Sequence, residues 1–158
     1  MKQPQKGRDA AEVGSANAVL RGGRLVWHYD SRHDVVTLGY SNLTLENAQD
    51  VEWFERECEG FWTRFHGSAT PPARKDILVD MQGIVVKPGA AAAWNAARAR
   101  LAEKYLQKTY RFGGERRTQT AVHLGQALHN TEGTIHANRD EALAALLTDR
   151  AASTARRS

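Results

Sequence analysis

The stretch Lys75-Asp-Ile-Leu-Val-Asp-Met-Gln-Gly83 is a short apolar run that is bounded by charged residues and ends in glycine. A run of this length between turn residues is typical of a strand buried inside a parallel sheet. An alanine-rich segment follows and begins with Pro88, which suits the first turn of a helix. We therefore expect a central strand at 77–81 that leads into a crossover helix.

Strands and helices are expected to alternate on both sides of this strand. Alternating apolar residues predict two strands joined by a turn at 30–33, and Asn42 and Thr44 offer caps for the first helix. The predicted order is ββαβαβαβα, which indicates a single-domain α/β fold: a mixed, mostly parallel sheet with helices packed on it. We expect strands at 25–29, 35–40, 77–81, 106–112 and 133–137, and helices at 45–66, 88–104, 117–130 and from Asn138 onward.

Length and composition bound the fold and the compartment. A chain of 158 residues predicts one domain, placed at 18–149, between disordered polar tails at 1–17 and 150–158. The lone Cys58 excludes an internal disulfide and favours a reducing compartment. No apolar run is long enough for a membrane span, and residues 1–15 lack the apolar core of a signal peptide. We expect a cytoplasmic protein.

The basic charge balance does not indicate nucleic-acid binding. The net charge is +4 and the pI is near 9.5. The predicted tails contribute most of this charge, which leaves the predicted domain nearly neutral. Basic tails are usually solvated, so we expect no nucleic-acid partner.

Three stretches point to a known family: Asp76-Ile-Leu-Val-Asp-Met-Gln-Gly83, Leu43-Thr-Leu-Glu-Asn-Ala48 and Asn138-Arg-Asp-Glu-Ala-Leu-Ala-Ala-Leu146. They resemble the STAS domain, and more closely the SpoIIAA-like (STAS/SEC14-type) small bacterial proteins. The resemblance implies partner binding in signalling or regulation rather than catalysis. It also implies a regulatory Ser or Thr at the start of the helix after the central strand, where phosphorylation changes partner affinity. Here Gly89 or Ala90 stands at that place, so this switch is expected to be absent.

A partner surface is predicted on the outer face of the first helix and the loop after the central strand. Trp53 lies off the helix's apolar stripe, beside acidic residues that include Glu57. It is either an exposed contact anchor or packed against the sheet edge or the nearby loop. Lys87 and Gly89 complete the predicted surface. The acidic residues alone also fit an ordinary solvated helix face.

A second candidate site is the segment Gly113-Gly-Glu-Arg-Arg117, which precedes a predicted helix. Free backbone N–H groups of Gly113 and Gly114, with Arg116 and Arg117, suit an anion or an acidic peptide. The alternative is a turn with solvated arginines, since no phosphate-binding glycine motif is present.

The remaining reactive residue types predict no enzyme, cofactor or metal site. The six histidines show no metal-ligand spacing, and Cys58 lies on an apolar helix stripe, where a thiol acts as a small hydrophobe. Trp62 and Trp94 fall on core stripes, although the SEC14 resemblance would also allow a lipid pocket. We predict a non-enzymatic STAS-like interaction module with a protein partner, and as the alternative a protein that binds a small ligand or lipid. A homodimer is left open.

Overall fold

The computed structural model describes residues 22–67, 73–116, 118–120, 122 and 134–157, and it confirms the mixed α/β class. Strands and helices alternate along the chain, and two short strands are present that were not predicted. In order they are β1 (Arg24–Asp30), β2 (Val35–Ser41), β3 (Leu43–Leu45), α3 (Ala48–His66), β4 (Lys75–Asp80), β5 (Ile84–Val86), α4 (Pro88–Tyr105), β6 (Leu106–Phe112), β7 (Ile135–His136) and α6 (Arg139–Arg157).

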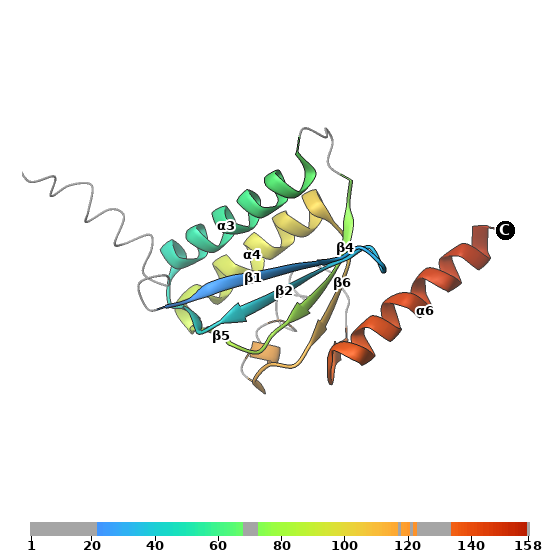
Figure 1. Cartoon of the computed structure of the whole chain (residues 1–158). Coiled ribbons are helices and arrows are strands. Elements are labelled where there is room, and N and C mark those ends of the chain that lie inside the picture. Colours follow the sequence, from blue (N-terminus) through green and yellow to red (C-terminus); the bar gives the residue numbers. More distant parts are fainter. Residues whose placement is uncertain (1–21, 68–72, 117, 121, 123–133, 158) are drawn as a thin grey trace, which may run out of the picture.

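The main sheet has the strand order β1-β2-β4-β6-β7, with the predicted central strand β4 in the middle (Figure 1). β1 pairs antiparallel with β2, and every other pairing in this sheet is parallel. The opening hairpin is therefore an antiparallel edge on a parallel sheet, as predicted. Parallel neighbours require crossover connections, which explains why a helix follows each internal strand.

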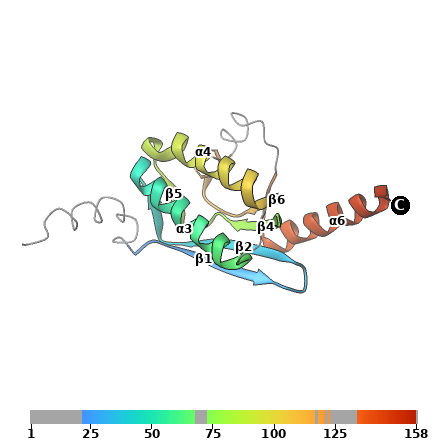
Figure 2. The ribbon, with the colours of Figure 1, turned by 90° about the horizontal axis from the view of Figure 1, so that it is seen from above.

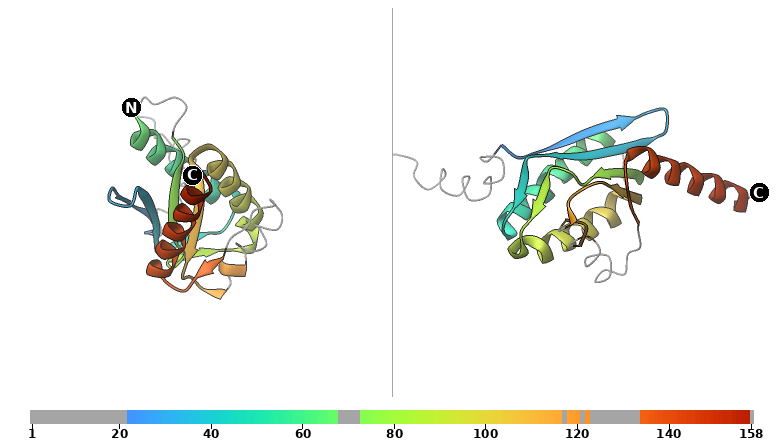
Figure 3. Two further views of the ribbon diagram at one scale, coloured as in Figure 1. Left: turned by 90° about the vertical axis from the view of Figure 1, so that its right-hand side faces the viewer. Right: turned by 90° about the horizontal axis from the view of Figure 1, so that it is seen from below.

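Helices cover both faces of the sheet (Figures 1 and 3). α3 and α4 pack on one face over Val36, Leu38, Ile77 and Val79. α6 packs on the other face, where Val35, Leu78, Tyr110 and Phe112 form a second cluster with Ala142 and Leu146. The two sets alternate along β2 and β4, because successive side chains of a strand point to opposite faces.

A two-stranded parallel sheet of β3 and β5, which the sequence did not predict, joins the starts of α3 and α4. Leu43 and Leu45 are fully buried in this pairing, so the chain stays extended where a helix was expected. The helix begins at Ala48, and its cap is Asn47, whose side chain accepts a hydrogen bond from the Asp50 N–H. The predicted caps Asn42 and Thr44 were wrong for this reason.

The predicted disordered tail at 150–158 was also wrong over the described residues, because α6 continues to Arg157. Alanines and arginines favour a helix, and Arg156 and Arg157 in the last turn interact favourably with its dipole. Residues 151–157 are all exposed, and this end of the helix projects beyond the sheet (Figure 2). The predicted tail at 1–17 and most of the helix predicted at 117–130 lie outside the described residues, although 118–120 and 122 are helical.

Candidate functional site

Trp53 does not form the exposed anchor of the predicted partner surface. Its side chain is 7% exposed and belongs to the main hydrophobic cluster beneath α3 and α4. The helical wheel identified only the residues that point directly at the sheet. The indole of Trp53 is large enough to reach the core from beside that face. Trp53 is therefore a core residue, and the interpretation as an exposed contact is corrected.

The other predicted partner residues are exposed but separated along the fold. Lys87 and Gly89 lie beside the start of α3: the Lys87 N–H donates to Leu45 O over 2.8 Å, and a Cβ on Gly89 would approach Glu46 O to 2.8 Å. Glu57 is exposed about two and a half turns further along α3. The structure places these residues on the surface without joining them into one compact patch.

In the predicted anion site at Gly113 and Gly114, one backbone N–H group already donates a hydrogen bond within the protein. Both glycines adopt positive φ, and the Gly113 N–H donates to His136 O of β7 over 3.2 Å. A Cβ on Gly113 would lie 3.5 Å from an Asp80 carboxylate oxygen, whose negative charge opposes an anion. Arg116 is exposed, and Arg117 lies outside the described residues. The Gly113 N–H is therefore not free for an anion, and the rest of this site stays a prediction.

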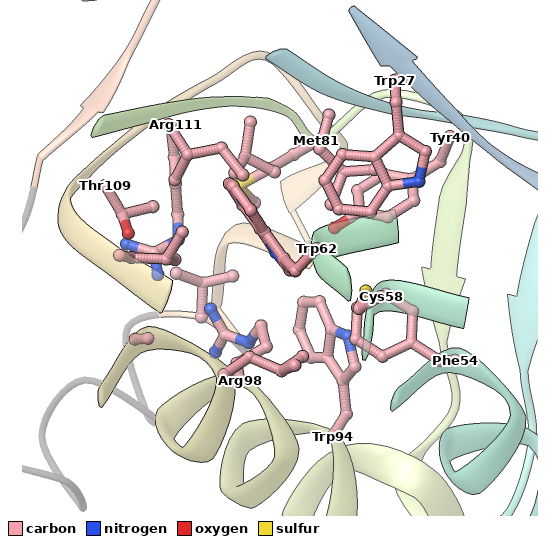
Figure 4. Close-up of a pocket in the computed structure, with 17 residues that line it drawn as sticks. Trp27, Tyr40, Phe54, Cys58, Trp62, Met81, Trp94, Arg98, Thr109 and Arg111 are labelled. Atoms are coloured by element: carbon pink, nitrogen blue, oxygen red, sulfur yellow. The ribbon is translucent and has the colours of Figure 1, made fainter. Parts of the chain in front are cut away.

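A more distinctive site is a pocket of about 60 Å³ between the sheet and helices α3 and α4 (Figure 4). Aromatic and aliphatic side chains form most of its wall, and two arginines enter it from neighbouring elements. Residues that line it include Trp27, Leu38, Tyr40, Phe54, Cys58, Trp62, Ile77, Val79, Met81, Trp94, Arg98, Leu101, Ala102, Leu106, Thr109, Arg111 and Val122.

Arg98 reaches the pocket from α4, one helical turn after Trp94. Its guanidinium lies 4.1 Å from the centre of the Trp94 ring and donates to the Asn95 side chain. Its Nε is enclosed and has no hydrogen-bond partner. Burial, together with the nearby charge of Arg111, lowers the pKa of Arg98 to about 9. This cation is held largely by a ring face and one amide oxygen.

Arg111 reaches the same pocket from β6, because Tyr110 and Phe112 on either side of it point into the opposite cluster. Burial lowers the pKa of Arg111 as well. Figure 4 shows Arg98 and Arg111 on the same side of the pocket, away from Trp27 and Tyr40. Within the described residues, neither guanidinium forms an ion pair with a carboxylate.

The pocket has a buried aromatic floor and two arginines on one side. Trp62, Trp94 and Cys58 are buried, whereas Arg98 and Arg111 are half-buried, as is Ala102 next to them. Burial, with nearby glutamates, raises the pKa of the Cys58 thiol. Cys58 is thus a protonated part of the apolar wall rather than a nucleophile.

Sequence reasoning missed both arginines, although signals for them were present. Arg98 lies between Ala97 and Leu101 on the apolar stripe of α4, and Arg111 alternates with two buried aromatic residues on β6. A charged residue at a core-facing position is the unusual feature that marks such a site.

Comparison with known proteins adds no family assignment: no family model matches the chain, and no curated protein matches its sequence. In the part of the chain that the structure describes, His, Cys, Asp and Glu side chains form no cluster suited to a metal ion. No helix among the described residues has the length and apolar character needed to cross a membrane.

Proposed function

We propose that this protein is a non-enzymatic, STAS-like ligand-binding module of the bacterial cytoplasm, which binds a small molecule between α4 and the sheet. The observation that carries the proposal is the pocket itself, an aromatic cavity into which Arg98 and Arg111 project without a carboxylate partner among the described residues. Ligand pockets typically combine apolar walls with a few convergent polar groups, and this pocket has that composition.

The size of the cavity restricts the ligand. Its volume of about 60 Å³ is well below the roughly 150 Å³ of an apolar cavity that admits benzene. An acyl chain does not fit in this space, so the geometry favours a small polar molecule over the lipid that the SEC14 resemblance suggested. The tight wall also suits a sensor of a simple metabolite or ion better than a carrier.

The test is to follow the tryptophan indole N–H signals by NMR during titration with a panel of small polar compounds. Trp27, Trp62 and Trp94 line the pocket, whereas Trp53 is a core residue away from its wall. Binding in the pocket shifts the first three signals more than the Trp53 signal. Native mass spectrometry of the freshly purified protein then shows whether a small ligand accompanies it.

A filled-pocket variant has a matched control on the same helix. Ala102 is half-buried and lines the pocket, whereas Ala92 is exposed on α4. We expect Ala102→Leu to abolish the selective shifts and Ala92→Leu to leave them intact. Selective shifts that persist in Ala102→Leu, or no selective shift with any compound and no co-purified ligand, would count against the proposed function.

The projecting end of α6 favours a second candidate function, namely binding of a protein partner in signalling. Its residues 151–157 are all exposed and include Arg156 and Arg157, so an acidic partner is the natural match. Truncation after Arg150 should leave the melting temperature nearly unchanged, because these residues are all exposed. If a partner is isolated, unchanged affinity of the truncated protein for it would remove α6 from the interface. The affinity of Glu57 and Lys87 variants for the same partner tests the partner surface that was predicted from the sequence.

A further inference from the structure

The polar groups that surround the pocket are mostly hydrogen-bond donors. Arg98 and Arg111 are cations without acceptor capacity. The Trp94 indole Nε1 also lines this region and, like Arg98 Nε, is buried without a hydrogen-bond partner. The acceptors among the lining side chains are few and neutral, such as the hydroxyls of Tyr40 and Thr109. A cavity with this balance is complementary to a ligand that accepts hydrogen bonds.

The charge balance points in the same direction. The two guanidiniums lie near each other, because the positive charge of Arg111 disfavours the charged form of Arg98. Nearby cations, such as Arg100, are paired with carboxylates, in that case Glu55 over 2.9 Å. Buried charges without a counter-charge are costly and are normally paired. A bound anion would supply a counter-charge that none of the described residues provides.

We propose that the ligand of this pocket is a small planar oxyanion, a carboxylate, bicarbonate or nitrate of about three or four heavy atoms, held between the guanidiniums of Arg98 and Arg111. This inference rests on the proposed function and names its ligand class. The planar fork of a guanidinium matches two oxygens of such an anion, and the aromatic wall accepts its apolar edge.

The experiment uses acetate and acetamide, which have the same shape and differ in charge. We expect acetate, formate or nitrate to shift the indole signals of Trp94 and Trp62 selectively, and acetamide to have a much weaker effect. Chloride and sulfate are included at equal ionic strength to separate site binding from general salt effects. Binding of acetamide without acetate would overturn the anion proposal and leave the proposed ligand-binding function in place.

Two pairs of variants connect binding to the arginines. Arg98→Met is compared with Arg100→Met on the same helix, and Arg111→Met with Lys108→Met on the same strand, because Arg100 and Lys108 are exposed. Each pocket variant should weaken anion binding roughly 10- to 100-fold, the usual effect of losing a charged hydrogen-bond donor. Each control should stay within about twofold of the wild type in Kd.

Stability measurements separate loss of the site from loss of the fold. Replacing an unpaired buried charge with an apolar side chain of similar volume is often neutral or stabilising. We therefore expect Arg98→Met and Arg111→Met to keep or raise the melting temperature while they lose anion binding. Equal binding in a pocket variant and its control, or no binding of any oxyanion to the wild-type protein, would overturn the inference. If acetamide and every other neutral compound also fail to bind, the proposed ligand-binding function is overturned as well.

Discussion

Arg150 of α6 forms an ion pair with Asp76 at the start of β4, with Nε 3.0 Å from the carboxylate Oδ2. The same guanidinium donates to the backbone carbonyls of His33 and Asp34 in the turn between β1 and β2. Asp76 is only 8% exposed. One side chain thus joins the last helix to the central strand and to the edge hairpin, three parts of the chain that are distant in sequence.

We expect Arg150→Ala to lower the free energy of unfolding by about 2 kcal/mol. Removing one partner of a fully buried pair typically costs about 3–5 kcal/mol, and the partial exposure of Arg150 reduces this. Arg156→Ala, an exposed change on the same helix, is the control and should stay within about 0.5 kcal/mol of the wild type. Urea unfolding at neutral pH measures both, and equal stability of the two variants would contradict the structural role of Arg150.

Burial of Trp53 changes the expected effect of its substitution. Trp53→Ala should destabilise the domain by about 3–5 kcal/mol, since it removes a large side chain from the main cluster. Glu57→Ala, at an exposed position one turn after Trp53 on α3, should stay within about 0.5 kcal/mol of the wild type. Denaturant unfolding with tryptophan fluorescence compares the two. A stable Trp53→Ala domain would mean that the indole is not a core residue.

The sequence was sufficient for the mixed α/β class because the apolar patterns of the long elements are strong. β4 reads as a buried strand, and the Pro88 start of α4 and the hairpin of β1 and β2 were predicted within a few residues. The missed strands β3 and β5 have three residues each, too few for a period to be visible. Their pairing depends on contacts between segments about forty residues apart, which local patterns do not contain.

The candidate site was less predictable than the fold for a different reason. Arg98 and Arg111 each occupy a core-facing position, so each was detectable as an anomaly in its own element. Their convergence on one pocket depends on the crossover that places α4 over β6, which requires the three-dimensional arrangement (Figure 4). For the glycine loop at 113–114, the sequence predicted a free N–H group for an anion. In the structure the Gly113 N–H donates to His136 O of β7 instead.

Gly83 should be intolerant of a side chain because two constraints meet at this residue. Its φ is +81°, and a Cβ would lie 2.3 Å from the carbonyl oxygen of Tyr40 at the end of β2. Gly67 has a φ of +60° with nothing within 4 Å of its Cβ position, so it isolates the conformational cost. We expect Gly67→Ala to cost about 1–3 kcal/mol and Gly83→Ala at least about 2 kcal/mol more.

Thermal and urea unfolding of the two alanine variants provides the comparison. The Leu43 N–H donates to Gly83 O over 2.8 Å, so displacement of Gly83 should also disturb the pairing of β3 with β5. Hydrogen exchange of the Leu43 amide should therefore accelerate in Gly83→Ala and not in Gly67→Ala. Similar stability of the two variants would contradict this prediction, because it would mean that the Tyr40 carbonyl moves away from the new Cβ at no cost in free energy.

The pH dependence of oxyanion binding follows from the lowered pKa values of the two arginines. The pKa of Arg98 is lowered to about 9 by burial and by Arg111, and burial lowers the pKa of Arg111. Only the protonated guanidinium attracts an anion, so acetate affinity should be constant from about pH 6 to pH 8 and fall above about pH 9. Titrations at constant ionic strength measure this profile.

The stability of the ligand-free protein should change with pH in the opposite direction. Above about pH 9, the unfolded chain keeps a proton on Arg98 that the folded state releases. Stability rises with pH wherever the unfolded state binds more protons, so this group raises the free energy of unfolding between about pH 9 and the ordinary arginine pKa. Because other groups also titrate there, the quantity to measure is the difference between wild type and Arg98→Met. That difference should shift in favour of the wild type as the pH increases, and a constant difference up to about pH 10.5 would show that Arg98 stays protonated in the folded state.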